Sequence, residues 1–588
     1  MNDEELSTLP QLAVPSNLDD SSASQAPVGS SSVPEDVAKF IVKFHQALKE
    51  KDLPTLTAAY ERGWNALTQQ HYSQSEWPSE EAVASLVDND QIFLTLYREL
   101  SYRHIYARLR PNIDDRFHSY ETSCELFNFL LNSDGPVDLE LPGQWVWDLL
   151  DEFIWQFQSF GQYRGDFKGK GEEEIAILAE GNQVWSCYSV LNVLYSLIQK
   201  SNIREQLIAE ANGASPEEVA QIAGEYGSKP LYRNLGYFSI ICLLRVHVLL
   251  GDFTLALKVM DPIPLTRKAD FTKVTACHVA VYYYVGFAYL SLGRYADAAA
   301  TFVSILRYFS RMQQFHTRSY QYGQISKTCD RMYALLAICT TLAPGPVEDA
   351  TGILQTMKEQ LGDKLTELSR GSIPTYSELY LNSCPKFISA NPPPYDDAAL
   401  YALYTSSPPV EAPNRHLSIF LADVESLVSV PTTRSLLKLY TSIDAGKLGG
   451  LTDEDDESVL VSLMVAKWAG RAIRWSEGDA GLLDGKRGVS HNLDFYVDNG
   501  MIQVAETTES RRFATHFIRK AEAAQRVHES IRSAPLPITK PGSAQSSTAA
   551  AAGGAGTSTG QAGSKGGVNG QGGAKGPRKT VAWGAARS

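Results

Sequence analysis

Two segments near the middle of the chain resemble each other at a fixed spacing of 42 residues, and this repeat limits the fold more than any other feature. The segments are LLGDFTLALKVM (249–260) and SLGRYADAAATF (291–302). Their matched positions are Gly251 with Gly293, Phe253 with Tyr295 and Ala256 with Ala298. Small residues let two antiparallel helices approach while an aromatic ring fills the gap. The pattern predicts a tetratricopeptide-like helical-repeat solenoid; the simpler alternative is one ordinary helical hairpin.

Helical spacing continues through most of the chain. The segments 145–160 and 184–200 carry aromatic and aliphatic residues at helical intervals. The 588 residues are 44% hydrophobic, which is enough for several folding units. Proline-rich stretches at 383–397 and 406–414 predict surface connections between helices. We therefore predict a mostly α fold.

The residues from 431 to 506 change character. The segment 431–443 predicts a short helix, DAGKLGG predicts a turn and a second one, and 451–475 predicts a long third helix. One stripe of the third helix is expected to face the core, and it contains Leu460, Met464, Val465, Trp468 and Ala472. A predicted β-hairpin follows, so the segment is predicted to be a winged-helix domain.

The hairpin prediction is based on Asn499 and Gly500, which form a favoured two-residue turn. If Asp498 faces Met501, successive side chains alternate between the two faces of the ribbon. One face then carries the predicted core residues Phe495, Val497, Ile502 and Val504. The other face carries Tyr496, Met501 and Gln503.

Both ends of the chain are expected to be disordered, and one more helix precedes the C-terminal tail. The segment 511–532 predicts that helix, with Phe513, Phe517 and Ile518 available for packing. The tail is rich in Gly, Ala and Ser, contains no acidic residue, and carries a charge of +6 from Lys540, Lys565, Lys575, Arg578, Lys579 and Arg587.

Charge argues against general nucleic-acid binding. The net charge is −14, so the whole surface cannot serve to neutralise phosphates. The third helix of the winged helix starts with five acids, Asp453 to Glu457, which duplex phosphates would repel. This run is either a solvated helix cap or a device that excludes nucleic acid. Weak RNA contacts are expected only from Arg511, Arg512, Lys575, Arg578 and Lys579; the equal alternative for the tail is a linker with incidental charge.

No catalytic or metal-binding pattern is present in the sequence. RGDFKGKGEEE (164–174) does not have the spacing of a phosphate-binding loop, because Gly171 stands where Ser or Thr would be needed. The seven cysteines are never spaced as CxxC and are expected to be reduced, mostly buried thiols. The N-terminus lacks the basic and apolar regions of a signal peptide. We expect a soluble intracellular protein that is not an enzyme and has no metal, cofactor or membrane contact.

Several long strings closely resemble the subunit L family of eukaryotic translation initiation factor 3, a PCI-domain family. They are LYRNLGYFSIICLLRVHVLLGDFTLALKVM (231–260), YYYVGFAYLSLGRYADAAATFVSIL (282–306), SCPKF (383–387), RSLLKLYTSIDAGKL (434–448) and DFYVDNGMIQVAE (494–506). The resemblance runs in order from about residue 35 to 532. The basic tail and the five-acid run depart from the family pattern, so their role stays open.

The resemblance implies a cytoplasmic, non-catalytic scaffold that supports binding to the small ribosomal subunit, assembly of the pre-initiation complex and recruitment of messenger RNA. Winged helices of neighbouring subunits would pack side by side, through Tyr496, Met501 and Gln503 among other residues. Unpaired edges of the wing would accept a neighbour's strand. The last helix would join a bundle by burying Phe513, Phe517 and Ile518.

The expected domains are a disordered acidic arm (1–33), an N-terminal helical domain (34–230), a helical-repeat region (231–430, with the PCI module starting near 300), the winged helix (431–506), the bundle helix (507–532) and the disordered basic tail (533–588). A different function remains open on this architecture, because PCI scaffolds also occur in the proteasome lid and the COP9 signalosome. A third alternative, a nucleic-acid-binding winged-helix regulator, is disfavoured by the acidic run.

Overall fold

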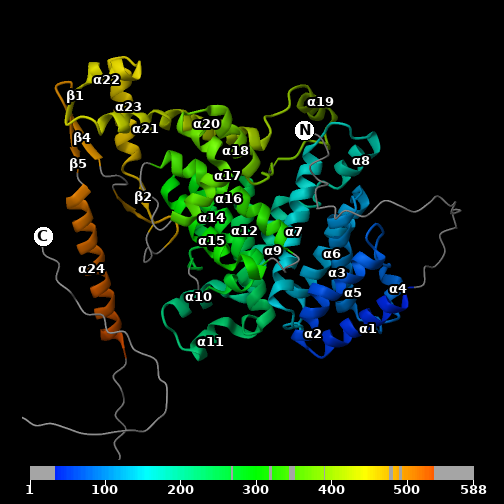
Figure 1. The fold of residues 1–588 in the computed structure, drawn as a ribbon. Helices are drawn as coiled ribbons and strands as arrows, with labels where there is room; N and C mark the ends of the chain where they lie inside the picture. The colour runs from blue at the N-terminus through cyan, green and yellow to red at the C-terminus, as the bar shows by residue number, and fades with distance from the viewer. Residues whose placement is uncertain are drawn as a thin grey trace, which may run out of the picture. The chain divides into compact units, whose positions relative to one another are not determined.

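The computed structural model of the chain describes residues 33–265, 269–316, 321–343, 351–389, 391–475, 481–488, 493–506 and 508–534 (Figure 1). The chain divides into two compact units, with the boundary between Phe513 and Ala514. The fold is mostly helical, and the predicted order of a helical-repeat solenoid followed by a winged helix is confirmed. Apart from residues at their borders, the predicted arm and tail lie outside the described residues.

The N-terminal helical region precedes the repeats. It contains α1 (Glu35–Lys49), α2 (Leu53–Ala58), η2 (Ala59–Gly63), α3 (Trp64–His71), α4 (Glu80–Ala84), α5 (Gln91–Arg108), α6 (Ile113–Asn132), α7 (Gly143–Gly165), α8 (Glu172–Glu180), α9 (Cys187–Ser201), α10 (Ile203–Ala211) and α11 (Pro216–Gly227).

The repeat region follows directly. It contains α12 (Pro230–Leu250), α13 (Phe253–Val259), η3 (Asp270–Lys273), α14 (Thr275–Ser291), α15 (Tyr295–His316), α16 (Tyr322–Leu342), α17 (Thr351–Ser369), α18 (Ile373–Ser383), α19 (Ala398–Ser406) and α20 (Ala412–Leu427).

The helix α12 joins these two regions, because it packs against α7 and α9 on the N-terminal side and against α13 and α14 on the repeat side. Seventeen of its 21 residues are buried. By length and apolarity alone this helix could cross a membrane, but 83% of its apolar stretch is buried inside the protein, which is typical of a core helix. One hydrophobic core therefore includes residues from Val37 to Val424 on both sides of residue 230, and Leu482 joins it. The boundary at residue 230 stays a prediction.

The predicted repeat is present as two helical hairpins, α12–α13 and α14–α15. Gly251 and Gly293 sit in the two connections with φ of +86° and +71°, a conformation that glycine adopts without strain. Gly286 shows why a small residue is needed, since a Cβ there would lie 2.4 Å from the Phe302 ring. Ala256 and Ala298 are fully buried. The equivalent positions in the two copies therefore have the same structural role.

The winged helix contains α21 (Ser429–Leu437), β1 (Ser442–Asp444), α22 (Ala445–Thr452), α23 (Asp456–Ala469), β2 (Ile473–Arg474), β3 (Lys486–Arg487), β4 (Leu493–Asp498) and β5 (Met501–Glu506). The strands β1, β5 and β4 form one antiparallel sheet with β5 in the centre, and β2 pairs with β3 separately. The segment 431–443 is therefore not one helix, because its last residues form β1. The final helix, α24 (Thr508–Ser533), matches the predicted one closely.

Candidate subunit-docking surface

The winged helix has a small hydrophobic core of its own. Its nine buried members are Leu437, Ile443, Ala445, Leu448, Val459, Leu463, Leu493, Phe495 and Ile502. They come from α21, α22, α23 and the three-stranded sheet, and each of these elements buries one of its faces in this core. The hairpin register is the predicted one, with Asp498 paired to Met501 across Asn499 and Gly500.

The helix α23 buries a different face from the one predicted. Val459, Leu463 and Ala466 are buried. The predicted core residues Leu460, Met464 and Trp468 are instead 40%, 73% and 70% exposed, so this prediction was wrong. A shift of one residue rotates the chosen face by about 100°. Both stripes are apolar, so neither contains a polar residue that could distinguish the buried face from the exposed one.

These exposed side chains, together with Val461, form a continuous apolar strip along α23, which we name the docking face. Residues three and four apart on a helix are neighbours, so Leu460, Met464 and Trp468 follow one another along the surface. The Arg487 guanidinium lies 5.2 Å from the centre of the Trp468 ring. The strip thus has an aromatic and a cationic group at its C-terminal end.

The hairpin divides its predicted core residues between two environments. Phe495 and Ile502 are buried, and Val504 packs against the same core. Val497 is 42% exposed, in contradiction to the prediction, because β4 is an outer strand whose burial ends after Phe495. On the opposite face, Tyr496 and Met501 are exposed, and Gln503 is half-buried in the central strand. A role for these three in an interface stays a prediction.

The sheet is less open at its edges than a two-stranded wing would be. The strand β1 pairs with β5, so that edge is already covered by a strand of three residues. On β4, the Phe495 carbonyl accepts a hydrogen bond from the Lys467 ammonium. The Phe495 amide donates to the Asp494 carboxylate at 2.9 Å. The expectation that both hairpin strands leave unpaired edges is therefore corrected: β5 is the central strand, and the outer strands are β1, with three residues, and β4, on which side chains occupy the Phe495 backbone groups.

The five acids mark the junction of two helices. Asp453 ends α22 in the left-handed region with φ of +57°, and Asp455 stands at the N-cap position of α23. A hydrogen bond from the Ser458 side chain lowers the pKa of Asp455. Asp456 and Glu457 lie in the first turn, where the helix dipole favours negative charge. The position of these acids at the helix start agrees with the helix-cap interpretation, but the Asp455 side chain makes no capping hydrogen bond.

The helix α24 is amphipathic and exposes its apolar residues. Phe513, Phe517 and Ile518 are exposed, as are Val527 and Ile531 further along. Of the predicted RNA contacts, Arg511 and Arg512 fall in α24 with side chains outside the described residues. Lys575, Arg578 and Lys579 lie outside the described residues altogether. Those contacts stay predictions.

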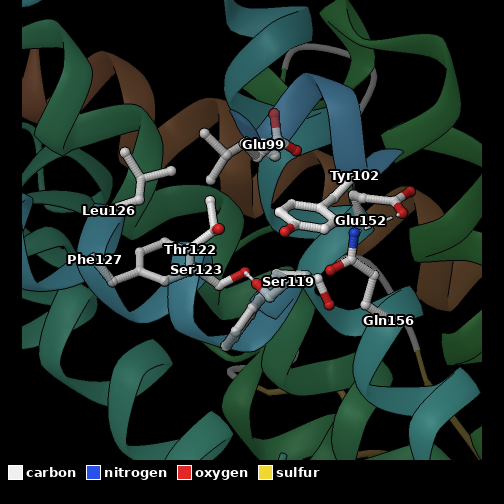
Figure 2. Close-up of a pocket in the computed structure, with 11 residues that line it drawn as sticks. Glu99, Tyr102, Ser119, Thr122, Ser123, Leu126, Phe127, Glu152 and Gln156 are labelled. Atoms are coloured by element: carbon white, nitrogen blue, oxygen red, sulfur yellow. Dashed lines mark hydrogen bonds between the residues drawn. The ribbon is translucent and has the colours of Figure 1, made fainter. Parts of the chain in front are cut away.

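A polar interior region lies among α5, α6 and α7 (Figure 2). A cavity of about 10 Å³, room for one water molecule, is lined by Glu99, Ser119, Thr122, Glu152 and Gln156, among others. The Glu99 Oε2 atom is buried and has no hydrogen-bond partner. Burial raises the pKa of Glu152 to about 7, against the opposing effect of Arg103. Such a space is too small for an organic substrate.

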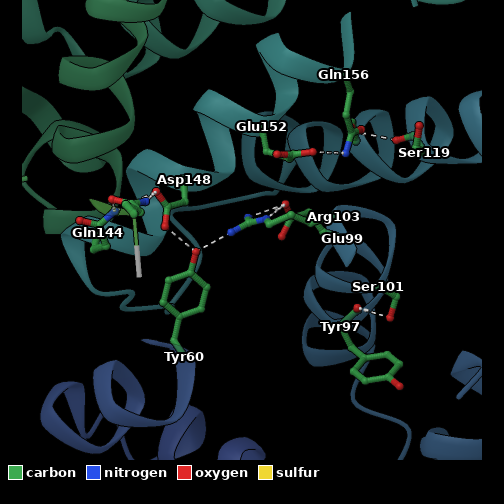
Figure 3. A network of polar contacts seen from close by, with 12 residues as sticks. Tyr60, Tyr97, Glu99, Ser101, Arg103, Ser119, Gln144, Asp148, Glu152 and Gln156 are labelled. Atoms are coloured by element: carbon green, nitrogen blue, oxygen red, sulfur yellow. Dashed lines mark hydrogen bonds and ion pairs between the residues drawn. The ribbon is translucent and has the colours of Figure 1, made fainter. Parts of the chain in front are cut away.

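The same carboxylates belong to a wider polar network (Figure 3). Arg103 donates to Glu99 at 2.6 Å and to the Tyr60 hydroxyl. The Tyr60 hydroxyl in turn donates to Asp148 Oδ2 at 2.6 Å. These contacts join η2, α5 and α7, so the network has a structural role in holding N-terminal helices together.

Other chemistry-bearing side chains are packed in the core. Burial raises the pKa of Cys384 to about 11 and that of Cys329 to about 12, so both thiols are protonated at neutral pH. Within the described parts of the chain, no three residues of His, Cys, Asp or Glu are grouped as metal ligands. The apolar docking face and α24 are therefore two surfaces whose exposed side chains need a functional explanation.

Comparison with known proteins gives a consistent result. A family model described as RNA polymerase I-associated factor PAF67 matches residues 115–524. Eukaryotic translation initiation factor 3 subunit L of Mycosarcoma maydis is 49% identical over 511 residues, which cover 86% of this chain and 75% of the relative. The protein of the same name from Nematostella vectensis is 43% identical over 84% of this chain and 92% of its own length. The human one is 42% identical over 80% of this chain and 82% of its own. The chain therefore belongs to the eukaryotic translation initiation factor 3 subunit L family.

Proposed function

We propose that this chain, as a component of translation initiation factor 3, is a non-catalytic scaffold that binds neighbouring subunits through the docking face and α24. The observation that carries the proposal is the apolar strip of α23, where Met464 and Trp468 are exposed although the other face of the same helix is buried. Large exposed apolar side chains in a continuous patch are typical of protein-binding surfaces.

The energetics favour side-chain docking on α23. Burying one large apolar side chain in a partner contributes about 2 kcal/mol. Tryptophan is among the residues that most often dominate binding energy when they are buried at the centre of an interface. Strand addition is less favoured, because β1 covers β5 and side chains occupy the Phe495 backbone groups.

The wider role follows from the family. We propose that the assembled complex acts in the cytoplasm on the small ribosomal subunit and supports pre-initiation complex assembly and recruitment of messenger RNA. The relatives bear the name of an initiation factor subunit, which favours this role over a scaffold in the proteasome lid or the COP9 signalosome. Contact with RNA through Arg511, Arg512 and the tail is part of the proposal as a weak, salt-sensitive contribution.

The test is recovery of the other initiation factor 3 subunits with the tagged full-length chain, quantified by mass spectrometry. Substitution of Met464 and Trp468 by Asp should lower recovery about a hundredfold, because two apolar contacts are lost and two charges would be buried. A second variant with Phe513 and Phe517 changed to Asp tests the role of α24 in the bundle, and its recovery should fall as well.

A matched control changes Leu400 and Leu403, two exposed leucines of α19, to Asp. This control should keep normal recovery, and circular dichroism should show unchanged helix content in all variants. Normal recovery of the Met464/Trp468 variant would exclude the docking face as an interface. Normal recovery of the Phe513/Phe517 variant would exclude the bundle role of α24.

A further inference from the structure

One position differs in chemistry between the two copies of the repeat. After Gly251 the first copy has Asp252, whose carboxylate caps α13 by accepting from the Leu255 amide at 3.0 Å. After Gly293 the second copy has Arg294. An arginine has no acceptor and cannot cap a helix N-terminus in this way. Arg294 therefore cannot cap α15 as Asp252 caps α13, and its side chain makes other contacts.

Arg294 binds a segment of the chain that lies almost 190 residues away. Its guanidinium donates to the carbonyls of Leu482 at 3.2 Å, Leu483 at 2.8 Å and Asp484 at 3.1 Å. Its Nε atom donates to Asp297 Oδ2 at 2.8 Å, which fixes the orientation of the side chain. Both Arg294 and Asp297 are buried. We name residues 481–484 the strap.

Further contacts hold the strap and the nearby Trp475 on the solenoid. The Tyr289 hydroxyl donates to the Leu482 carbonyl at 2.7 Å. Asp261 lies against the strap, since a Cβ at Gly481 would be 2.7 Å from its Oδ1 atom. The other oxygen of Asp297 accepts from the Trp475 amide at 3.1 Å.

The strap lies within the sequence of the winged helix, but its side chains pack against the solenoid. It lies between β2 and β3, and so between α23 and the wing. The Leu482 side chain is nevertheless buried in the solenoid core, and Leu483 and Trp475 pack against that core. None of the three belongs to the core of the winged helix.

We propose that Arg294 is a positioning residue: by holding the strap on the solenoid, it fixes the orientation in which the docking face is presented to a partner subunit. The strap begins twelve residues after the end of α23, and Trp475, six residues after it, is also held by the solenoid, so the two anchors restrict rotation of α23 against the repeats. The two hydrophobic cores are separate, and this segment of the chain adds a connection between them to the contacts of α20 with α21 and α23. This inference rests on the proposed function of the docking face.

Arginine suits this task for a geometric reason. Its planar guanidinium carries five donors in a fixed arrangement, and here they reach three successive carbonyls and one carboxylate. A lysine ammonium is a single point of charge and cannot span three carbonyls at once. Arg294→Lys should therefore resemble Arg294→Ala more than the unchanged chain.

The first measurement is hydrogen exchange of the full chain. Arg294→Ala should speed exchange of the amides in 481–488 by about tenfold or more, while α12 and α14 keep their protection. Arg471→Ala, at an exposed arginine beyond the C-terminal end of α23, is the matched control and should change nothing. Leu482→Ala provides a second, milder way to loosen the strap if the arginine variant is poorly folded. Unchanged exchange in both strap variants would overturn the inference.

The second measurement distinguishes positioning from mere stability by tethering the strap covalently. A Cβ at Gly481 would lie 3.1 Å from Asp261 Cγ, so Asp261→Cys with Gly481→Cys places two thiols within disulfide range. In the Arg294→Ala background, recovery of the other initiation factor 3 subunits should fall when the pair is reduced and return when it is oxidised. Failure of the oxidised tether to restore recovery would overturn the positioning role.

The two proposals fail in different ways. Normal recovery of the Met464/Trp468 variant would remove the docking face, whatever the strap does. Normal recovery of Arg294→Ala with accelerated exchange would leave the docking face intact and show that its orientation does not depend on Arg294.

Discussion

The solenoid and the winged helix use their large apolar side chains in opposite ways. The largest fully buried side chains, such as Trp145, Trp185 and Phe302, all belong to the solenoid and its N-terminal helices. The winged helix has a core of nine residues and leaves Met464, Trp468 and Tyr496 exposed. The same residue types therefore stabilise the chain in one region and remain available for association in the other.

The largest expected difference between the two regions is in the stability lost when one aromatic residue in each is replaced by alanine. Phe302→Ala should lower the free energy of unfolding by about 4 kcal/mol, because it leaves a cavity in a packed core. Trp468→Ala should change it by less than about 0.5 kcal/mol, because that side chain is mostly exposed. Urea unfolding followed by circular dichroism measures both values, and a loss at Trp468 comparable to that at Phe302 would break the comparison.

A change of pH should have an intermediate effect on stability, because the pKa of one carboxyl group in each region is shifted, and the two shifts have opposite directions. The pKa of Glu152 is raised to about 7 by burial, so the folded state holds this proton more tightly than the unfolded chain does. Its contribution to stability is present below about pH 4.5 and is lost as the pH rises through 7. Partial exposure of the side chain reduces the loss to about 2 kcal/mol.

Glu152→Gln is the matched variant, since it keeps the shape and removes the titration. Its melting temperature should fall less than that of the unchanged chain between pH 5 and pH 8. In the winged helix, the lowered pKa of Asp455 predicts the opposite dependence, a loss as the pH falls through its folded value. Parallel melting curves for the Glu152 variant and the unchanged chain would contradict the assignment.

The smallest effect compares two glycines with positive φ. Gly293 joins two solenoid helices with φ of +71°, and Gly500 closes the hairpin with φ of +80°. A Cβ at either position meets no heavy atom within 4 Å, so Ala should cost only the backbone strain of about 1 kcal/mol. Hydrogen exchange should place the effect of Gly500→Ala in β4 and β5 and that of Gly293→Ala in α14 and α15. Spread of either effect into the other region would show that the two cores unfold together.

Predictions from the sequence were most accurate where a residue type has a single structural explanation. Gly251 and Gly293 adopt the left-handed conformation that ends a helix, and their spacing identified the repeat. Asn499 and Gly500 identified the hairpin and its register for the same reason.

Prediction failed where two alternatives have the same hydrophobic pattern. The stripe with Leu460, Met464 and Trp468 is as apolar as the stripe with Val459 and Leu463, and only tertiary packing decides between them. The strand β1 was missed because three residues show no clear period. Its stability depends on β5, which lies some sixty residues later.

The strap was missed for a different reason. The charged residue after Gly293 fits the repeat pattern, so Arg294 resembled an ordinary surface residue of a turn. Its partners are backbone carbonyls far along the chain, and these carry no signature in the sequence. The difference between Asp252 and Arg294 at equivalent positions of the repeat was the one sequence signal that could have pointed to the strap.

The sheet edges affect how a newly synthesised chain behaves before it binds its partner subunits. Such an orphan subunit exposes apolar side chains on α23, yet Lys467 and Asp494 already occupy the backbone groups of Phe495 on the outer strand. Strand-to-strand stacking, which starts from open edges, is therefore less favoured at β4, and β1 offers only three residues for it. Premature association should therefore be a reversible contact between helices rather than a fibre, so that unassembled copies remain recoverable.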